Sequence, residues 1–264
     1  METSIISWNV NGLQGILKKD IHGNKGTRFT DDNPISMMIK DQQPDIICLQ
    51  EIRCSSKFNH CPHFPDYEYQ YSNYAVKRGY SGTLIVSKIE PINVFYNYEM
   101  MPNITDSGLT EEGRLITLEF EDYFLVNVYA PNSGVKTFAR LEWRVSIWES
   151  NFRKYLRELM ETGKGVIIVG DLNVIPTNLD TSWKKVDMIT GATPGERDAF
   201  QKLLKLGFTD CYRSKNPKSR EYTWTVRPNA GHRMDFTLVS TLKYVNSEIL
   251  DYVGSDHRPI KLSF

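Results

Sequence analysis

The sequence lacks the features that mark secreted and membrane-spanning proteins. It has only four cysteines, at positions 48, 54, 61 and 211, and they show no paired framework, as is typical of a reduced intracellular protein. No basic stretch followed by a long apolar core occurs near the N-terminus, so we expect no signal peptide. Apolar runs such as Val166–Gly170 are far too short to span a bilayer. We therefore expect an intracellular protein, in the cytoplasm or the nucleus, that has no membrane partner.

An excess of charge of either sign is also absent. Lys+Arg and Asp+Glu both number 32, which argues against binding nucleic acid through the whole surface but not through one local basic face. No internal repeat, low-complexity tract or linker divides the chain. A chain of 264 residues is within the range of one α/β domain, so we predict a single domain over residues 1–264.

Short β-rich runs recur along the whole chain, some alternating and some continuously apolar, as expected of strands covered on both faces. They lie at residues 4–10, 45–50, 67–72, 82–88, 114–120, 123–130, 165–174, 234–240 and 260–264. Helical patterns lie between them, at residues 34–41, 137–163 and 196–206. The apolar stripe of the long helix consists of Leu141, Val145, Trp148, Phe152, Leu156 and Leu159. This alternation predicts an α/β protein in which two sheets pack together with helices outside.

Polar side chains stand where the predicted strands end. In chain order they are Asn9 and Asn11, Gln50 and Glu51, Tyr129 and Asn132, Asp171 and Asn173, Asp235, and Asp256 with His257. One such residue is ordinarily a turn residue, but six strand ends with almost no Lys or Arg indicate one site on a rigid scaffold. Carboxylate and amide oxygens suit Mg²⁺, which commonly acts on phosphates. The pattern therefore predicts metal-assisted phosphodiester hydrolysis.

Other chemistries fit the sequence less well. It has no plausible Ser-His-Asp or Cys-His nucleophile pair and no Walker-type glycine-rich loop. Cys54, His60, Cys61 and His63 lie close together, which suggests zinc, but their spacing matches no common zinc pattern and a loop is favoured.

The chain resembles the exonuclease III class of apurinic/apyrimidinic (AP) endonucleases, within the endonuclease/exonuclease/phosphatase superfamily. Motifs in family order run from Ser7 to Ile260, among them "SWNVNGL", "PDIICLQE", "NVYAPNSG", "RLEWR", "GDLNV", "GATPGER", "GFTD", "RMDF" and "GSDHRPI". The resemblance implies a four-layer sandwich, with two mixed β-sheets packed face to face and helices on the outside. It also implies a Mg²⁺-dependent enzyme of base excision repair, with Mn²⁺ as a substitute metal.

The implied substrate is double-stranded DNA with abasic sites or blocked 3′ ends. Cleavage 5′ to an abasic nucleotide would leave a 3′-hydroxyl and a 5′-deoxyribose phosphate, and the same enzyme would have 3′-5′ exonuclease or 3′-phosphodiesterase activity. Flipping an abasic residue costs less than flipping a normal nucleotide, which helps selectivity. A monomer is expected.

Carried over position by position, the resemblance implies three sets of residues. The metal would be held by Asn9, Glu51, Asp171, Asn173 and Asp256. The catalytic residues would be Tyr129, Asp171, Asn173, Asp235 and His257. The substrate would be bound by Asn11, Asn132, Trp224 and Met234. The sequence leaves open whether Asp171 or His257 is the general base.

Some positions depart from the family pattern. Asn11 stands where many animal members have Asp, and His232 stands where they have Trp. The connection from Leu17 to Asn33 is longer than usual, and its Lys18, Lys19, Lys25 and Arg28 are candidates for DNA backbone contact, as are Lys77-Arg78 and the basic run 213–220. For each of these basic segments an ordinary solvated surface is the alternative. Arg144 is expected to form a structural ion pair.

Two alternative functions differ in testable ways. A phosphatase or phosphodiesterase acting on a lipid or a nucleotide would keep the metal residues but lack "GATPGER" and "RLEWR", which are present. A catalytically dead DNA-binding module would have lost at least one of Glu51, Asp171, Asn173, Asp235 or His257, and all are present.

Overall fold

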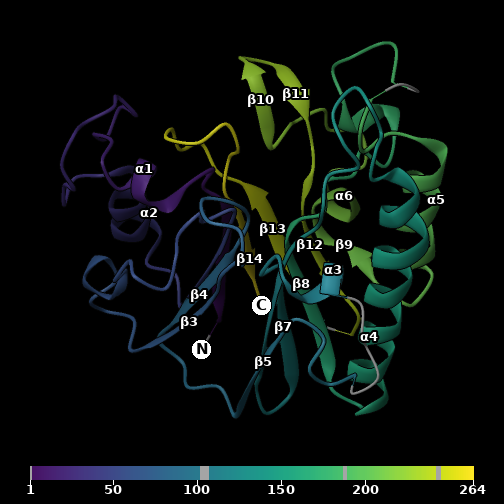
Figure 1. The fold of residues 1–264 in the computed structure, drawn as a ribbon, viewed down its shortest axis with the longest axis horizontal. Helices are drawn as coiled ribbons and strands as arrows, with labels where there is room; N and C mark the ends of the chain where they lie inside the picture. The colour runs from purple at the N-terminus through teal and green to yellow at the C-terminus, as the bar shows by residue number, and fades with distance from the viewer. Residues whose placement is uncertain (1, 102–106, 187–188, 242–244) are drawn as a thin grey trace.

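Two six-stranded β-sheets lie face to face in a computed structural model of the chain, which describes residues 2–101, 107–186, 189–241 and 245–264 (Figure 1). The first sheet has the order β13-β14-β1-β2-β4-β3 and the second β5-β6-β7-β8-β12-β9. Each mixes parallel and antiparallel pairs, since β1 runs parallel to β2 but antiparallel to β14, and β8 runs parallel to β7 but antiparallel to β12.

The strands are shorter than the β-rich runs of the sequence. The first sheet contains β1 (Ser4–Asn9), β2 (Ile46–Gln50), β3 (Tyr69–Asn73), β4 (Thr83–Ser87), β13 (Asn246–Ile249) and β14 (Ile260–Ser263). The second contains β5 (Asn93–Tyr96), β6 (Leu115–Glu119), β7 (Tyr123–Tyr129), β8 (Gly165–Asp171), β9 (Thr209–Asp210) and β12 (Asp235–Val239). A separate hairpin pairs β10 (Trp224–Arg227) with β11 (Ala230–His232). The β5, β9, β10, β11 and β13 strands were not predicted, because runs of two to four residues carry little periodic signal.

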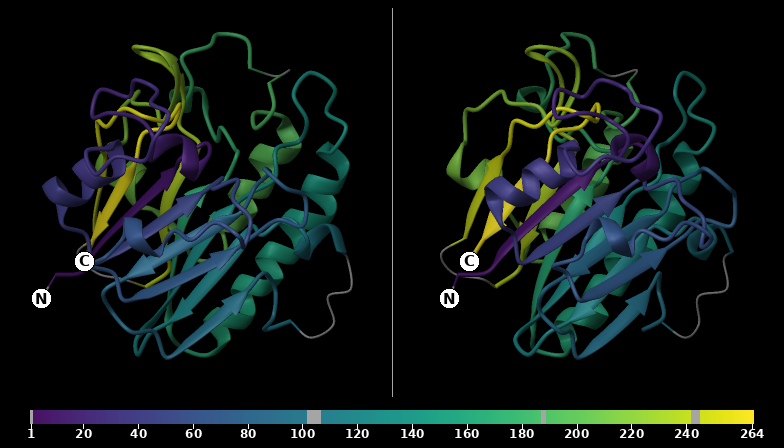
Figure 2. Two further views of the ribbon diagram at one scale, coloured as in Figure 1. Left: turned by 60° about the vertical axis from the view of Figure 1, so that its left-hand side comes forward. Right: turned by 90° about the vertical axis from the view of Figure 1, so that its left-hand side faces the viewer.

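Helices cover the outer face of each sheet (Figures 1 and 2). The helices are α1 (Leu13–Ile16), α2 (Pro34–Gln42), α3 (Ser107–Thr110), α4 (Glu149–Glu161), α5 (Pro194–Leu204) and α6 (Cys211–Lys215), with the 3₁₀ turns η1 (Cys61–His63) and η3 (Asn178–Asp180) and the π-helical turn η2 (Trp143–Trp148). Unlike the others, α6 contacts β13 of the first sheet and β12 of the second. The four-layer α/β sandwich is confirmed. No helix in the described part of the chain combines the length and the apolar character that crossing a bilayer requires.

Strand alternation divides the apolar side chains among three layers. Ile5, Ile167 and Leu125 belong to the core between the sheets. Residues of opposite orientation on the same strands face the helices: those of the first sheet pack against α1 and α2, and those of the second pack against α4 and α5. The outer core of the first sheet includes Ile6, Trp8, Leu49, Ile35 and Met38. That of the second includes Val126, Ile168, Phe152, Leu156 and Phe200.

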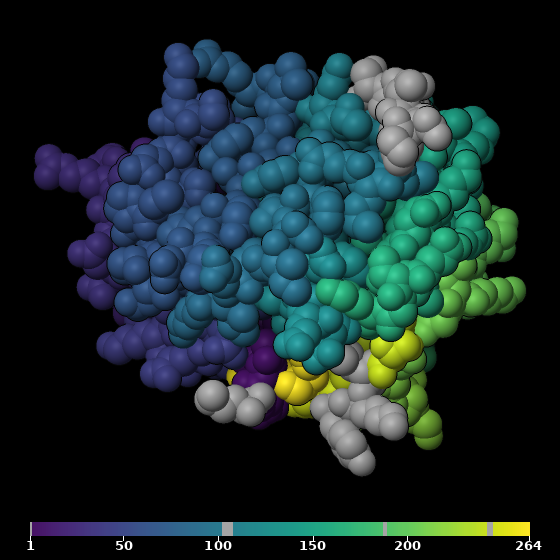
Figure 3. Space-filling model, turned by 90° about the horizontal axis from the view of Figure 1, so that it is seen from below, coloured from purple at the N-terminus to yellow at the C-terminus, as the bar shows by residue number. Residues whose placement is uncertain are grey.

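The layer between the sheets becomes polar at one end. Gln50 Nε2 donates to Ser7 Oγ and to Asn127 Oδ1, each at 2.8 Å, and this joins the two sheets. The chain termini lie at the other end, where Thr3 N donates to Phe264 O at 2.8 Å and the purple and yellow ends of the chain are adjacent in the view from below (Figure 3). Strands that start beside the termini therefore carry their last residues to the polar end.

The predicted long helix begins later than expected. Residues 135–137 and 139–140 form turns, residues 141–142 begin the helical stretch, η2 follows, and the regular helix α4 begins at Glu149. The apolar stripe is correct for Trp148, Phe152, Leu156 and Leu159 but wrong for its start, because Leu141 and Val145 are only half-buried. The wider π-helical turn rotates the face of the helix, so that Arg144 is buried instead.

Candidate active site

Strands from both sheets deliver polar side chains to one cavity at the polar end. Asn9 ends β1, Tyr129 ends β7, Asp171 ends β8, and Asp235 begins β12 directly opposite Asp171. The cavity has a volume of about 570 Å³. Ten of the predicted site residues line it, namely Asn11, Glu51, Tyr129, Asn132, Asp171, Asn173, Trp224, Met234, Asp256 and His257. The other two, Asn9 and Asp235, are buried behind it and contact the lining residues.

Left-handed turns aim several of these side chains. Asn11, Glu51 and Asn173 follow strand ends with φ angles of 47°, 54° and 48°. Asn adopts this conformation readily, but a Glu there is strained by about 1 kcal/mol. Backbone hydrogen bonds hold the turn at Glu51, whose carbonyl accepts from Gly12 N at 2.8 Å. This strain is located where the side chain must leave the sheet and enter the cavity.

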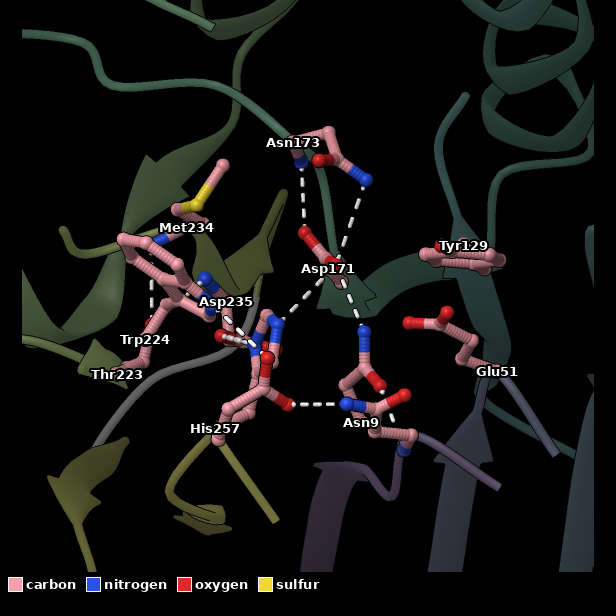
Figure 4. A network of polar contacts seen from close by, with 12 residues as sticks. Asn9, Glu51, Tyr129, Asp171, Asn173, Thr223, Trp224, Met234, Asp235 and His257 are labelled. Atoms are coloured by element: carbon pink, nitrogen blue, oxygen red, sulfur yellow. Dashed lines mark hydrogen bonds and ion pairs between the residues drawn. The ribbon is translucent and has the colours of Figure 1, made fainter. Parts of the chain in front are cut away.

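Asp171 is at the centre of the polar network (Figure 4). Its Oδ2 accepts from Asn9 Nδ2 at 2.9 Å and its Oδ1 accepts from Asn173 N at 2.8 Å. Burial and the neighbouring charge of Asp235 raise the pKa of Asp171 to about 7, although His257 and the two donated hydrogen bonds favour the charged form. Asp171 is therefore a buried carboxyl group that can change its proton occupancy near neutral pH.

His257 and Asp235 form a buried pair. The Nδ1 of His257 lies 2.8 Å from Asp235 Oδ2, and its Nε2 lies 3.9 Å from Asp171 Oδ2. Burial opposes a charge on the imidazole, but the neighbouring carboxylates outweigh it and raise the pKa of His257 to about 10. The imidazole is thus a cation at neutral pH, with Nε2 directed towards the cavity side of the pair.

The phenol of Tyr129 lies on the opposite side of Asp171 from His257 (Figure 4). Burial raises the pKa of Tyr129 well above its ordinary value of 10, so the hydroxyl keeps its proton. Arg114 lies 4.8 Å from the centre of the Tyr129 ring and donates to the Tyr129 carbonyl at 2.8 Å. Arg114 therefore fixes the position of the phenol.

Two asparagine side chains hold each other at the edge of the cavity. Asn132 Nδ2 donates to Asn173 Oδ1 at 3.2 Å, and Asn173 Nδ2 donates to the Ala130 carbonyl at 2.9 Å. Because both ends of the Asn173 amide are engaged, it is better placed to orient Asp171 than to bind a metal directly. The buried Arg144 donates to the Leu172 carbonyl at 2.6 Å and to the Pro131 carbonyl, and pairs with Glu149 at 3.0 Å. The predicted ion pair of Arg144 is confirmed.

The carboxylates around the cavity fit a hard divalent cation. Glu51 and Asp256 line the same cavity as Asp171, and Figure 4 shows the Glu51 carboxylate pointing towards the centre of the network. Burial disfavours the charge of Asp256, but His257 and donors from Trp224 and Asn11, at 3.0 and 2.9 Å, lower its pKa below the usual value. Carboxylate oxygens of this kind are the ligands that hard divalent cations prefer.

The described residues contain one compact group of His, Cys, Asp and Glu ligand atoms, formed by Asp171, Asp235 and His257 within 4.8 Å of one another. Within that group His257 and Asp235 bond to each other, which leaves Asp171 as the member available to a metal. Cys54 is buried and Cys61 is exposed, and over the described residues neither belongs to such a group. Residues 51–60 are irregular or form turns, and η1 follows them.

Aromatic rings form one wall of the cavity. The His232 ring stacks on Trp224 with centroids 5.2 Å apart and planes inclined by 10°, and Trp183 meets His232 edge to face at 4.5 Å. Burial lowers the pKa of His232 to about 4, so it acts as a neutral ring. Met234 packs beside Trp224. The sequence analysis did not identify Trp183, because a lone Trp between strands has no pattern that marks it.

A buried ion-pair cluster anchors the segment that carries Met234 and Asp235. Arg233 bonds to Asp180 at 2.7 Å and to Asp210 at 2.8 Å, and Arg213 bonds to Asp180 at 2.6 Å. Of the basic run 213–220, Arg213 is half-buried and engaged in this cluster. Contact between the run and the DNA backbone stays a prediction. The sequence analysis did not identify the cluster, because its members lie far apart along the chain.

Comparisons with known proteins agree with this geometry. A sequence profile of the endonuclease/exonuclease/phosphatase family matches residues 6–257. The chain is 35% identical over 270 residues to an exodeoxyribonuclease of Bacillus subtilis, with 98% of each protein covered. It is 36% identical over 273 residues to the DNA repair nuclease APEX1 of Danio rerio, which covers 98% of this chain and 81% of that protein. The crystal structure of an AP endonuclease from Leishmania major matches with a TM-score of 0.83 and 26% identity, over 100% of this chain and 87% of that one.

Proposed function

Because the chain belongs to the endonuclease/exonuclease/phosphatase family, we propose that it is a Mg²⁺-dependent hydrolase of DNA repair that cuts the phosphodiester 5′ to an abasic site. Its relatives are named as an exodeoxyribonuclease and a DNA repair nuclease, and the function they share is the cleavage of DNA. The products would be a 3′-hydroxyl and a 5′-deoxyribose phosphate.

One observation carries the proposal. Three carboxylates, Glu51, Asp171 and Asp256, line a single cavity together with the imidazolium of His257. The carboxylates would hold a divalent cation on one side of a phosphate, and the positive His257 would contact the same phosphate from the other side. This arrangement suits the negative charge that develops on a phosphoryl group during displacement. A bound Mg²⁺ would polarise a phosphoryl oxygen and lower the pKa of a coordinated water.

The pKa values support different roles for the two candidate bases. His257 is protonated at neutral pH and so cannot accept a proton from water, but it can donate a hydrogen bond to a phosphate oxygen through Nε2. Asp171 has a pKa of about 7, which is suited to a general base near neutral pH. We therefore assign the proton from the attacking water to an Asp171 carboxylate oxygen, with Asn9 and Asn173 N fixing the orientation of the carboxylate.

The neutral donors would bind the substrate. The protonated phenol of Tyr129 and the amide of Asn132 are placed to donate hydrogen bonds to phosphate oxygens, because both line the cavity. Trp224 and Met234 provide an apolar wall for a sugar without a base. A flipped abasic nucleotide has no base to accommodate, which favours it over an intact nucleotide.

The test is incubation with a duplex that contains one tetrahydrofuran site. We expect incision at that site in Mg²⁺, with a 3′-hydroxyl end, and no incision in EDTA. Asp171→Asn and His257→Ala should lose incision by at least about a thousandfold while remaining folded. Incision that persists in EDTA, or wild-type rates for either variant, would refute the assignment.

Activity on blocked 3′ ends would use the same centre. The support is that a relative is named exodeoxyribonuclease, and that a 3′ phosphatase from Neisseria, solved bound to a product DNA hairpin, matches this fold with a TM-score of 0.78 and 25% identity over 99% of each chain. The wild type should remove the 3′-phosphate from a nicked duplex that carries one, and Asp171→Asn should not. Equal removal of the 3′-phosphate by both proteins would show that this activity does not use the active site of abasic-site incision.

A further inference from the structure

The long connection between β1 and α2 contains an ordered hairpin. Lys19 and Lys25 pair as an antiparallel bridge, and we call residues 19–25 the lysine hairpin. Asp20 closes its turn, because Asp20 Oδ1 accepts from the backbone N–H groups of His22 and Asn24, each at 2.9 Å. The residues that follow the hairpin are also fixed, since Gly26 N donates to the Lys18 carbonyl at 2.8 Å. The hairpin is therefore a built element of the fold.

The lysine hairpin is attached to the segment that carries the catalytic residues. The ammonium group of Lys19 donates to the carbonyl of Gly254, two residues before Asp256. Figures 1 and 2 show the purple hairpin beside the yellow loop that leads into β14. The hairpin is thereby joined by a hydrogen bond to a segment at the edge of the active site.

A second cavity lies between the hairpin and the active site. Its volume is about 390 Å³, and Lys18, Lys19 and Lys25 line it. Asn11 and Asp256 line both this cavity and the active-site cavity, so the two are neighbours that share a wall. Gly26 and Gly254 also line it, and without side chains they leave the backbone open to a ligand.

The charges in this second cavity favour an anion. Three lysines face one carboxylate, that of Asp256, which already accepts from Asn11 and Trp224. Lys19 bonds to a neutral carbonyl and Lys18 lies over the Phe29 ring at 5.0 Å, so neither contact neutralises a charge. Burial, and after it the charge of Lys25, lowers the pKa of Lys19, although Asp256 partly offsets this. A bound anion would relieve the repulsion between the lysines.

We propose that the lysine hairpin forms a phosphate-binding pocket that takes a backbone phosphate of the bound DNA, within one or two nucleotides of the scissile phosphate. This inference rests on the proposed function. A backbone phosphate suits the pocket because the two cavities are neighbours that share Asn11 and Asp256 as lining residues. Nearby phosphates of one DNA strand could therefore occupy both cavities. Such a contact adds affinity without reading sequence.

The first test compares Lys25→Ala with a matched control, Lys154→Ala, which removes an exposed lysine from α4 on the outer face of the second sheet. Binding of a tetrahydrofuran duplex in EDTA is measured by fluorescence anisotropy over a range of salt concentrations. For Lys25→Ala we expect affinity to fall about five- to tenfold and the slope of log K against log[salt] to shrink by about 0.9, as for one lost phosphate contact. Lys154→Ala should match the wild type.

A second variant moves the hairpin without removing charge. A Cβ on Gly26 would lie 2.5 Å from the Lys18 carbonyl oxygen, so Gly26→Ala must displace the backbone there. Gly195→Ala is its control, because a Cβ there would meet Val145 at ordinary contact distances of 3.5 and 3.7 Å. Gly26→Ala should weaken binding by a similar factor to Lys25→Ala, and Gly195→Ala should not.

Two further arms locate and identify the ligand. The duplex is shortened stepwise on one side of the tetrahydrofuran site or on the other. Shortening on only one of the two sides should abolish the difference in affinity between Lys25→Ala and the wild type. If inorganic phosphate stabilises the wild type more than Lys25→Ala while both proteins bind the duplex equally, the ligand is a free phosphate and the proposal is wrong. Equal affinity and slope for Lys25→Ala and Lys154→Ala would also overturn it. Failure of the wild type to incise the abasic duplex would instead overturn the proposed function.

Discussion

Two buried clusters of charge lie close together in this protein and differ in how completely they are neutralised. The structural cluster joins Arg213 and Arg233 to Asp180 and Asp210 through ion pairs of 2.6 to 2.8 Å. The catalytic cluster contains Asp171, Asp235 and His257, with two carboxylates and one imidazole. Arg233 and Asp180 are as fully buried as the three residues of the catalytic cluster, so burial alone does not explain the difference in their behaviour.

The pKa directions show the consequence of that difference. In the structural cluster, burial opposes the charge of Asp180, but Arg233 outweighs it and the pKa falls below its ordinary value. In the catalytic cluster, burial and the charge of Asp235 raise the pKa of Asp171 instead. In a cluster with equal numbers of opposite charges, the charges neutralise one another. A cluster with one excess carboxylate keeps a negative charge that a bound cation can neutralise.

The largest expected effect comes from breaking the structural cluster. Asp180→Ala leaves the buried Arg233 without one of its two partners, and losing one member of a buried pair typically costs about 3–5 kcal/mol of unfolding free energy. Urea denaturation in EDTA measures this. The control Asp198→Ala removes an exposed i,i+4 pair with Lys202 and should change little. A loss of similar size in both variants would show that the structural cluster has no special stabilising role.

A smaller effect of opposite sign is expected in the catalytic cluster. The pKa of Asp171 is raised from 3.8 to about 7 on folding, so its protonated form is favoured and its charged form costs stability. Asp171→Asn should therefore be more stable than the wild type in EDTA. The difference should grow as pH rises from about 3.8 to about 7 and level off above.

Thermal unfolding at a series of pH values measures the effect of Asp171→Asn. Asp122→Asn, at an exposed turn, is the matched control and should show no such growth with pH. A destabilised Asp171→Asn at pH 8 would mean that the Asp171 charge is already neutralised by His257, and the contrast between the two clusters would fail.

The smallest effect concerns an ion pair at the cavity edge. Arg53 bonds to Glu51 Oε1, with Nε at 3.0 Å, and its side chain is 44% exposed, unlike that of the buried Arg233. An exposed pair is weak, so a divalent cation can displace it. Arg53→Gln should lower the Mg²⁺ concentration that gives half-maximal thermal stabilisation by about two- to fivefold. Arg157→Gln, exposed on α4, should leave it unchanged. A higher midpoint in Arg53→Gln would mean that Arg53 orients Glu51 for the metal.

Much of the fold could be predicted from the sequence, because strands such as β8 are long, continuously apolar runs and the stripe around Phe152 has clear helical periodicity. The start of the long helix could not, since the burial of Arg144 depends on carbonyl groups of Pro131 and Leu172 that are distant along the chain. The short strands β9 and β13 likewise have no clear periodicity of their own and are defined by their pairing with β12 and β14.

The candidate site divides in the same way. Residues at the ends of strong strands, such as Asp171, follow from the pattern, because alternation places them in the layer between the sheets. Arg233, Trp183 and the second cavity beside the lysine hairpin required the structure, because each depends on contacts between segments with no common sequence signal. The predicted site residues were therefore those whose position depends on the strand that carries them.

The central claim is that Glu51, Asp171 and Asp256 together bind one divalent cation. Isothermal titration calorimetry of Mg²⁺ into the metal-free wild type, Glu51→Gln, Asp256→Asn and the exposed control Asp198→Asn measures this most directly. We predict one ion per chain for the wild type and the control, and affinity at least about tenfold weaker for Glu51→Gln and for Asp256→Asn. Wild-type affinity in both site variants, or no uptake of Mg²⁺ by the wild type, would contradict it.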